Sequence, residues 1–298
     1  MRLSAEPLSP QLAAKRDALL AMLGGLKGCA VAYSGGVDSA VVAQAAFLAL
    51  GDRAVAVTGV SASLAQGELQ AAADLAARIG IRHQVLATEE FADPNYLRNA
   101  PDRCFHCKSE LYTRLAALIE TLGMPVMVNG LNLDDRDDYR PGISAARDHD
   151  VRSPLAECGL TKDDVRQLAA HWGLPVWDKP ATPCLSSRIA YGEQVTPERV
   201  AMIDRAEQFL RARGLREVRV RYHAGDLARI EVPRGELARL LDEPLRLALV
   251  GHLRSLGFKF VTLDLEGFRS GSLNQLIGVD ELRVLKPSST TAAERTPC

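Results

Sequence analysis

The run SGGVDS at Ser34–Ser39 constrains this chain more than any other feature. It directly follows the apolar run Cys29–Tyr33 and directly precedes a stretch rich in Ala and Val. A glycine-containing turn between a buried strand and a helix is where parallel α/β sheets bind phosphate, because the N–H groups that begin the helix point at the anion. We therefore expect a parallel sheet with a phosphate loop after its first strand.

Further apolar and β-branched runs predict the rest of that sheet. After Cys29–Tyr33 come three more candidate strands: Ala54–Thr58, His83–Leu86 and Pro125–Asn129. Ala and Leu recur at helical spacing between them, in Ser39–Ala49, Leu64–Ile79 and Ser109–Leu122. Thr161 and Asp164 resemble a capping box that begins another helix. This alternation predicts an α/β fold, a doubly wound parallel sheet, over residues 1–180.

The pattern changes after the irregular segment Asp178–Gly192, which contains two prolines. Thr196 and Pro197 predict the start of a helix that continues to Arg213. The segments that follow predict two strands, a helix and a last strand: Glu217–Tyr222, Ala228–Val232, Gly235–Leu256 and Phe258–Leu263. We expect a smaller C-terminal α+β domain over residues 193–284, serving substrate binding or oligomerisation, and a flexible tail over residues 285–298.

Charge and hydropathy limit the kinds of molecule that the chain is expected to bind. The formal net charge is −1 and aromatic residues make up 5%, so the chain lacks the basic surface expected of a nucleic-acid-binding protein. No apolar run approaches the ~20 residues of a membrane helix, and Met1–Pro10 lacks the apolar stretch of a secretory signal. We expect a cytoplasmic protein that acts on a small molecule and binds neither nucleic acid nor membranes.

Each residue of the phosphate loop suits a nucleotide. Gly35 and Gly36 permit a tight turn, the hydroxyls of Ser34 and Ser39 add donors, and Asp38 suits phosphates only if Mg²⁺ lies between them. The loop lacks the lysine of GxxxxGK[ST], so we expect it to bind a pyrophosphate leaving group. It resembles the PP-loop of ATP pyrophosphatases, which implies ATP and Mg²⁺ bound by Ser34, Gly35, Gly36, Val37, Asp38 and Ser39. The alternative is an ordinary glycine-rich turn.

A second polar segment, residues 129–142, follows the fourth predicted strand. Strand carboxyl ends line the ligand-binding edge of such sheets. Asn129, Gly130 and Asp134 are therefore candidates to order the nucleotide or its Mg²⁺, and Arg140 is a candidate phosphate ligand. The alternative is a solvated acidic loop.

Three of the six cysteines form a candidate sulfur or metal site. Cys104 and Cys107 form a CxxC at the start of a helix, where Arg103, Lys108 and the helix dipole favour thiolates, and Cys184 lies in the irregular segment. Zinc would need a fourth ligand such as Cys158 or His106, whereas three thiolates suit a [4Fe-4S] cluster with one open iron. Cys29, Cys158 and Cys298 are expected to be small core residues.

Four motifs in this order resemble the LarE family of ATP-dependent sulfur transferases: SGGVDS, RCFHCKSELY, GLNLDDRDDYRPG and CLSSRIAYG followed by VRVRYHAGDLARIEV. The resemblance spans about Leu12 to Leu265. It implies that a carboxylate of pyridinium-3,5-biscarboxylic acid mononucleotide is adenylated, with Asp38 and Ser39 as catalytic residues, and then receives sulfur in nickel-pincer nucleotide synthesis. It also implies a homo-oligomer.

The family has two sulfur sources, and both stay open at this point. In one branch Cys184 is the catalytic residue and gives up its own sulfur. In the other, Cys104, Cys107 and Cys184 hold a [4Fe-4S] cluster that carries the sulfur. We favour the second, because Cys104 and Cys107 would be superfluous in a purely sacrificial enzyme.

Arginines of the second half are candidate ligands of the substrate phosphate. Arg219 and Arg221 alternate on a strand and so share one face, and Arg188 lies four residues beyond Cys184. The alternative is that these arginines simply face solvent. Glu207 is a weaker candidate for a cation ligand, its alternative being an exposed helical charge.

Three other functions compete with the sulfur-transferase prediction. A tRNA thiolase of the same superfamily would need a surface for RNA, and an amide-forming ligase like NAD or GMP synthetase would not need three cysteines. A nucleotide-sensing module without turnover would release no pyrophosphate.

Overall fold

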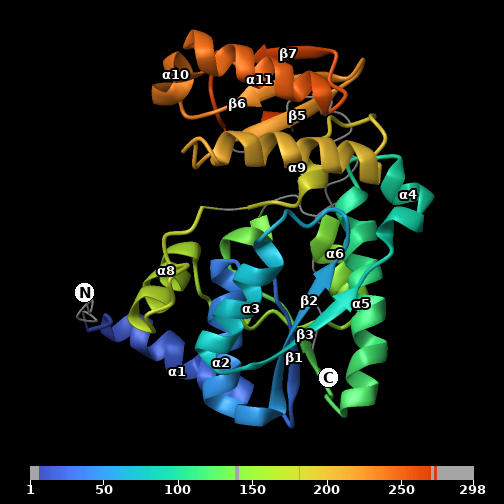
Figure 1. Cartoon of the computed structure of the whole chain (residues 1–298). Coiled ribbons are helices and arrows are strands. Elements are labelled where there is room, and N and C mark those ends of the chain that lie inside the picture. Colours follow the sequence, from blue (N-terminus) through green and yellow to red (C-terminus); the bar gives the residue numbers. More distant parts are fainter. Residues whose placement is uncertain (1–6, 138–140, 181, 270–271, 274–298) are drawn as a thin grey trace, which may run out of the picture.

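The structure is a computed structural model that describes residues 7–137, 141–180, 182–269 and 272–273. The described part contains two β-sheets, each with its own helices and apolar core. Figure 1 shows the smaller sheet and its helices stacked beyond the upper ends of the strands of the larger sheet.

The larger sheet is parallel, as predicted. Its order is β3-β2-β1-β4, with β1 at Cys29–Ala32, β2 at Ala54–Val60, β3 at Arg82–Ala87 and β4 at Met127–Val128. The first three strands lie close to the predicted runs. β4 is only two residues long, and on its other side a parallel bridge joins Val128 to Arg152, in which the N–H of Asn129 donates to the Arg152 carbonyl (2.9 Å).

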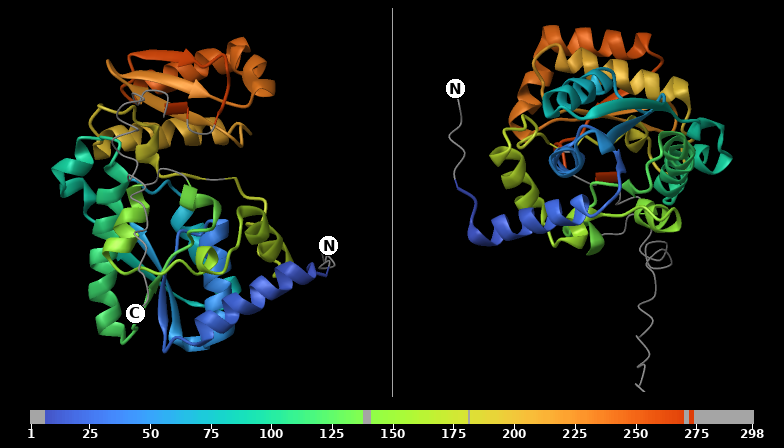
Figure 2. Two further views of the ribbon diagram at one scale, coloured as in Figure 1. Left: turned by 180° about the vertical axis from the view of Figure 1, so that it is seen from behind. Right: turned by 90° about the horizontal axis from the view of Figure 1, so that it is seen from below.

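Helices cover both faces of this sheet, because successive side chains of a buried strand point to opposite faces. Cys29 and Val31 pack into one core with α1 (Pro10–Gly24), α2 (Val37–Leu50), α3 (Glu68–Ile79) and α8 (Lys162–His171). Ala30, between them, packs into the opposite core with α5 (Arg103–Leu122) and α6 (Pro141–Asp148). Figures 1 and 2 show these two helical layers on either side of the strands.

The smaller sheet has the order β5-β6-β7. β5 (Arg219–His223) and β6 (Leu227–Glu231) are antiparallel, and β7 (Phe260–Leu263) is parallel to β6. Its core includes residues of α9 (Pro197–Arg211), α10 (Leu237–Leu241) and α11 (Glu243–Ser255). The short elements of the chain are α4 (Pro94–Leu97), α7 (Pro154–Glu157) and 3₁₀ turns η1 (Gly51–Arg53), η2 (Glu90–Ala92), η3 (Asp134–Asp137), η4 (Leu185–Arg188) and η5 (Arg234–Glu236).

One predicted helix is wrong as a single element. The stretch Gly235–Leu256 is divided into α10 and α11, because Asp242 takes extended backbone (φ −57°, ψ 128°) and Pro244 follows in the first turn of α11. Proline fixes φ and lacks an N–H, so it is tolerated there but not inside a continuous helix. The predicted tail, residues 285–298, lies outside the described residues.

The capping box that begins α8 is confirmed. The Thr161 hydroxyl accepts from the N–H of Asp164, whose carboxylate accepts from the N–H of Thr161. Across the described ranges, we find no helix with the length and apolar character needed to cross a membrane.

Candidate active site

The phosphate loop lies between β1 and α2. Gly36 caps the 14-residue α2, and Gly35 has a φ of +71°. A Cβ on Gly35 would lie 3.0 Å from the Cβ of Ala72, so the turn needs glycine both for its backbone angle and for space. Val37 is the first residue of α2 and is buried.

Two serine hydroxyls stabilise the conformation of this loop. The Ser39 hydroxyl accepts from the N–H of Ser34 (3.2 Å) and lies 3.1 Å from the Gly36 carbonyl, to which it donates. The two hydroxyl oxygens are 3.2 Å apart. The loop is therefore held open as a concave turn at the positive end of a helix, an arrangement suited to phosphate.

Asp38 has two partners that the sequence alone did not identify. Its Oδ2 lies 2.5 Å from Nζ of Lys162, and its Oδ1 accepts from Nδ2 of Asn132 (3.1 Å). Asn132 belongs to the predicted polar segment, but Lys162 does not. The capping box at Thr161 was the available signal, because it makes Lys162 the first residue of α8.

The predicted ligands of the polar segment lie beside the loop. Gly130 packs so closely that a Cβ on it would be 2.7 Å from the Ser39 nitrogen. Asn129 is buried and its Oδ1 accepts from the hydroxyl of Ser153 (2.9 Å), while Asp134 accepts from the N–H of Lys162 (2.8 Å). This part of the segment is not a freely solvated loop. Arg140 lies outside the described residues.

The three candidate cysteines come from two segments that meet. Cys104 and Cys107 are in the first turns of α5, and Cys184 immediately precedes η4. Cys104 and Cys184 are exposed, and Cys107 is partly buried. Burial first, and then the charge of the Cys184 thiolate, raise the pKa of Cys107 to about 12, with Lys108 opposing them. The thiols are thus electrostatic neighbours.

Metal ligation is not preformed here. Within the described ranges, no three side chains of the types His, Cys, Asp and Glu are arranged to hold a metal ion. Cys158, a possible fourth zinc ligand, instead lies 3.8 Å from the sulfur of Met22. His106, the other, lies between the carboxylates of Asp93 (3.4 Å) and Asp102 (3.5 Å).

A buried arginine connects the two cysteine segments. Nη1 of Arg103, next to Cys104, donates to the carbonyl of Ser186 (2.8 Å) and to Oδ1 of Asn99 (2.5 Å). Asn99 in turn donates to the carbonyls of Ala190 and Glu193, both at 2.9 Å. These bonds hold the start of α5, which carries Cys104 and Cys107, against the segment that follows Cys184.

A buried carboxylate lies on the other side of Cys184. Glu90 accepts from the hydroxyls of Ser61 (2.5 Å) and Ser63 (3.2 Å), and the Ser63 carbonyl accepts from the N–H of Leu185 (2.9 Å). The second carboxylate oxygen of Glu90, Oε2, has no hydrogen-bond partner among the described residues. The charge of Glu90 also contributes to the raised pKa of Cys107.

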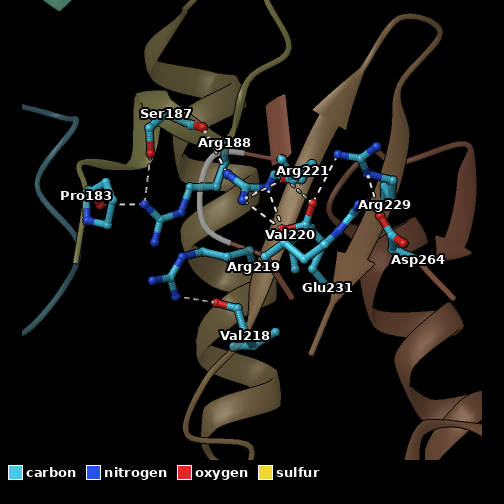
Figure 3. Close-up of polar contacts among 12 residues, drawn as sticks. Pro183, Ser187, Arg188, Val218, Arg219, Val220, Arg221, Arg229, Glu231 and Asp264 are labelled. Carbon is cyan, nitrogen blue, oxygen red and sulfur yellow. Dashed lines mark hydrogen bonds and ion pairs between the residues drawn. The ribbon is translucent and has the colours of Figure 1, made fainter. Parts of the chain in front are cut away.

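The alternative for the three arginines, that they simply face solvent, does not hold, because all three are buried. Arg188 is fully buried and pairs with Glu207 (3.0 Å), which is also fully buried. Its Nη1 donates to the carbonyls of Pro183 and Cys184, and Figure 3 shows it turned toward Pro183 and Ser187. Arg188 is thus committed to internal partners and does not present a guanidinium to a phosphate.

Neither role considered for Glu207, a cation ligand or an exposed helical charge, agrees with its contacts. Its oxygens accept from Arg188, from Arg211 (2.6 Å) and from the N–H of Val220 (3.1 Å). A carboxylate with these partners is neither an exposed helical charge nor a free cation ligand.

Arg219 and Arg221 share one face of β5, as predicted. Arg221 pairs with the buried Glu231 (2.8 Å), while the Arg219 guanidinium lies 5.0 Å from the ring centroid of Phe268 (Figure 3 shows the arginines). Burial first, then the charge of Arg188, lower the pKa of Arg219 to about 10. Arg219 therefore stays cationic at neutral pH, and both arginines are held in place by the fold.

Known proteins resemble the chain over nearly its whole length. A pyridinium-3,5-bisthiocarboxylic acid mononucleotide synthase from Lactiplantibacillus plantarum is 38% identical over 267 residues, covering 89% of this chain and 96% of the relative. Uncharacterized protein slr1717 of Synechocystis is 47% identical over 266 residues, covering 89% and 99%. No protein-family model matches.

More distant relatives match only part of the chain. A tRNA-specific 2-thiouridylase MnmA from Azorhizobium caulinodans is 35% identical over 189 residues, which cover 50% of this chain and 48% of the relative. The shared part indicates the common PP-loop superfamily. With the phosphate loop, the three cysteines and a nearly full-length match to the synthase, the chain belongs to the LarE-type family of adenylating PP-loop sulfur transferases and is an enzyme of that family.

Proposed function

We propose that this enzyme uses ATP to convert carboxylates of pyridinium-3,5-biscarboxylic acid mononucleotide into thiocarboxylates for the nickel-pincer nucleotide cofactor. The observation that carries the proposal is the 38% identity, over 96% of its length, to a synthase named for that thiocarboxylate product. The meeting of three thiols at the side of the molecule that holds the smaller sheet supports it.

ATP solves the chemical difficulty of the reaction. A carboxylate resists substitution because its leaving group would be oxide. Attack of the carboxylate oxygen on the α-phosphorus of ATP breaks the bond to the β-phosphate oxygen, releases pyrophosphate and leaves an acyl adenylate. The N–H groups of Gly36–Ser39 and the hydroxyls of Ser34 and Ser39 would bind the phosphates, and Asp38 would hold Mg²⁺.

The substrate's own phosphate would bind at the smaller sheet. Arg219 projects from one face of β5 and is the proposed phosphate ligand. The Arg221 guanidinium already donates to Glu231, to the Ser187 carbonyl and to Ser272, so Arg221 would support this face as Arg188 supports the Cys184 segment. Arg188 would act only by supporting the segment that carries Cys184, whose carbonyl it binds (3.0 Å).

For the sulfur atom we propose a [4Fe-4S] cluster held by Cys104, Cys107 and Cys184. The donors fit such a group chemically, because thiolates are its ligands and the cations Arg103 and Lys108 lie next to the CxxC. When bound, the cluster would carry the sulfur that replaces oxygen on the substrate. The protein's part is to bring the thiols together and to align the adenylate with them.

The exposed Cys184 keeps the sacrificial route as a second candidate. Its thiolate would attack the acyl carbon and expel AMP. Loss of the Cα proton and cleavage of the Cβ–S bond would then leave the thiocarboxylate and a dehydroalanine at position 184.

Anaerobic purification with iron and acid-labile sulfide assays separates the two routes, when combined with intact mass before and after incubation with ATP, Mg²⁺ and substrate. We expect bound iron and sulfide, lost in Cys104→Ser, Cys107→Ser or Cys184→Ser but retained in the control Cys158→Ser, and unchanged mass after turnover. A protein without iron that loses about one H₂S in mass at Cys184 would reject the cluster and establish sacrifice.

Partners complete the proposal. We infer a small nucleotide substrate, no nucleic-acid or membrane partner, and a homo-oligomeric assembly. The tRNA-thiolase alternative is less favoured, since MnmA relatives match only half of this chain. Pyrophosphate release that depends on tRNA, and not on the mononucleotide, would reverse that preference.

A further inference from the structure

Asn99 is a fully buried residue with left-handed backbone between the two segments that carry the candidate thiols. Its φ is +54°, and the residue is 0% exposed. It lies just beyond Arg98, the C-cap of α4, and before α5, the helix of Cys104 and Cys107. A residue that only ends a helix in this conformation is usually glycine. The turn by itself therefore does not explain an asparagine side chain here.

The two ends of the Asn99 amide bind opposite segments. Nδ2 donates to the carbonyls of Ala190 and Glu193, both at 2.9 Å, in the segment that follows Cys184. Oδ1 accepts from Nη1 of Arg103, the first residue of α5 (2.5 Å). A carboxamide serves both partners because it carries a donor and an acceptor, whereas a carboxylate has no donor for the carbonyls.

A second buried link joins the same segments. The hydroxyl of Tyr96, in α4, lies 2.7 Å from the hydroxyl of Ser186, and Arg103 donates to the Ser186 carbonyl (2.8 Å). Tyr96 is 1% exposed and Ser186 0%. Burial first, and then the charge of the Cys184 thiolate, raise the pKa of Tyr96, so this phenol is an electrostatic neighbour of the sulfur.

These links matter for any group that binds all three thiols. Cys104 and Cys107 share one helix, whereas Cys184 belongs to a separate segment that precedes η4. If that segment were ordered only on binding, the cost of ordering it would be subtracted from the affinity. Segments that are already held together avoid this cost.

We propose that Asn99 and Tyr96 are positioning residues of the sulfur site, which hold Cys184 against the CxxC helix so that the three thiols act as one ligand set. The inference rests on the proposed [4Fe-4S] site of Cys104, Cys107 and Cys184. The left-handed backbone of Asn99 places its amide between the two segments.

Two arsenicals test the proposal by calorimetry and intact mass in the reduced, metal-free protein. Arsenite, As(OH)₃, condenses with three thiols and releases three waters, so it requires Cys184 together with the CxxC pair. Phenylarsine oxide condenses with two thiols and releases one water. Measured in a Cys184→Ser background, it reports on Cys104 and Cys107 alone.

Asn99→Gly is the main variant, because glycine keeps the turn and removes the amide. We expect arsenite binding to weaken by about 10- to 100-fold, the range of two buried hydrogen bonds, and phenylarsine oxide binding to stay within about threefold. Asn99→Asp should also weaken arsenite binding, since aspartate tolerates this backbone and keeps an acceptor for Arg103 but loses both donors.

Tyr96→Phe tests the second link and decides the proposal if the Asn99 variants do not fold. It removes one hydrogen bond, so arsenite binding should weaken by about 2- to 10-fold. Val165→Ala is the control for stability, because Val165 is fully buried in the core of the larger sheet. It should leave the binding of both arsenicals unchanged.

Two results would overturn the inference while leaving the proposed function intact. Arsenite binding as tight as that of wild type in the Asn99 and Tyr96 variants would show that these side chains do not position the thiols. Equal losses for both arsenicals would show a general structural role. If arsenite forms no three-thiol adduct with the wild-type protein, the proposed three-cysteine site itself fails, and the inference fails with it.

Discussion

Replacing Arg188 with methionine tests how the fold supports the segment around Cys184. Arg188 and Glu207 are both 0% exposed and lie 3.0 Å apart. The substitution removes the guanidinium and leaves Glu207 buried, with Arg211 and the N–H of Val220 as its remaining partners. Breaking a buried pair from one side costs about 3–5 kcal/mol. Because two partners remain, we expect a loss near the lower end, about 3 kcal/mol of unfolding free energy.

Urea unfolding followed by two spectroscopic probes measures this loss. The double variant Arg188→Met/Glu207→Leu should be more stable than the single variant, because no buried charge is left without its partner. It should still fall about 1–3 kcal/mol below wild type, because the buried N–H of Val220 loses its acceptor.

A matched control uses an ion pair at the surface. Arg114 pairs with Glu110 (2.5 Å) on the outside of α5, and Arg114→Met should show no measurable loss. A single variant at Arg188 within 1 kcal/mol of wild type, on the scale of a surface pair, would refute the reasoning. So would a double variant less stable than the single one.

Three further predictions rest on close packing at Gly130, on the burial of Cys29 and on the exposure of Cys104 and Cys184. Gly130→Ala should abolish ATP-dependent pyrophosphate release while the fold is retained, because the new Cβ would lie 2.7 Å from the Ser39 nitrogen; Gly251→Ala, with nothing within 4 Å, is the control, and equal activity of the two would contradict the prediction. Burial raises the pKa of Cys29 to about 12, so the unfolded thiol ionises first and stability falls as pH rises above about 8.5. Between pH 8.5 and 10 the fall due to Cys29 should be about 2 kcal/mol, and denaturation curves of Cys29→Ala should lack it; parallel pH profiles would argue against it. In the metal-free protein, iodoacetamide should modify the exposed Cys104 and Cys184 before the buried Cys29, as peptide masses would reveal, and early labelling of Cys29 would be inconsistent with its burial.

Local patterns in the sequence were sufficient for much of the fold. Apolar runs predicted β1 and β2, since a parallel strand covered on both faces must be apolar throughout. The edge strand β3 has only exposed and partly buried residues, and the run His83–Leu86 located it. The capping box at Thr161 and the CxxC at the start of α5 were also readable, because capping and helix periodicity involve residues only three or four positions apart. The break at Asp242 was missed, although Pro244 gave a local signal for it.

The chemistry of the loop itself was also readable from the sequence. Gly35 and the two serines are adjacent in the chain, so their combined effect on a phosphate needs no distant partner. The absence of a lysine from SGGVDS was equally plain. The sequence did not show that Lys162 lies beside the loop, with its ammonium on Asp38.

Which distant residues meet depends on tertiary packing. It places Lys162 on Asp38 across 124 residues, and it buries Arg188 against Glu207 where the sequence allowed a solvent-exposed arginine. It also brings the Cys184 segment to Arg103 of the CxxC helix. No sequence period encodes such contacts, because they depend on how helices pack on sheets and on which charges can leave water only in pairs. Neighbouring residues specify the phosphate loop and the strands of its sheet, whereas packing brings Lys162 to Asp38 and Arg188 to Glu207.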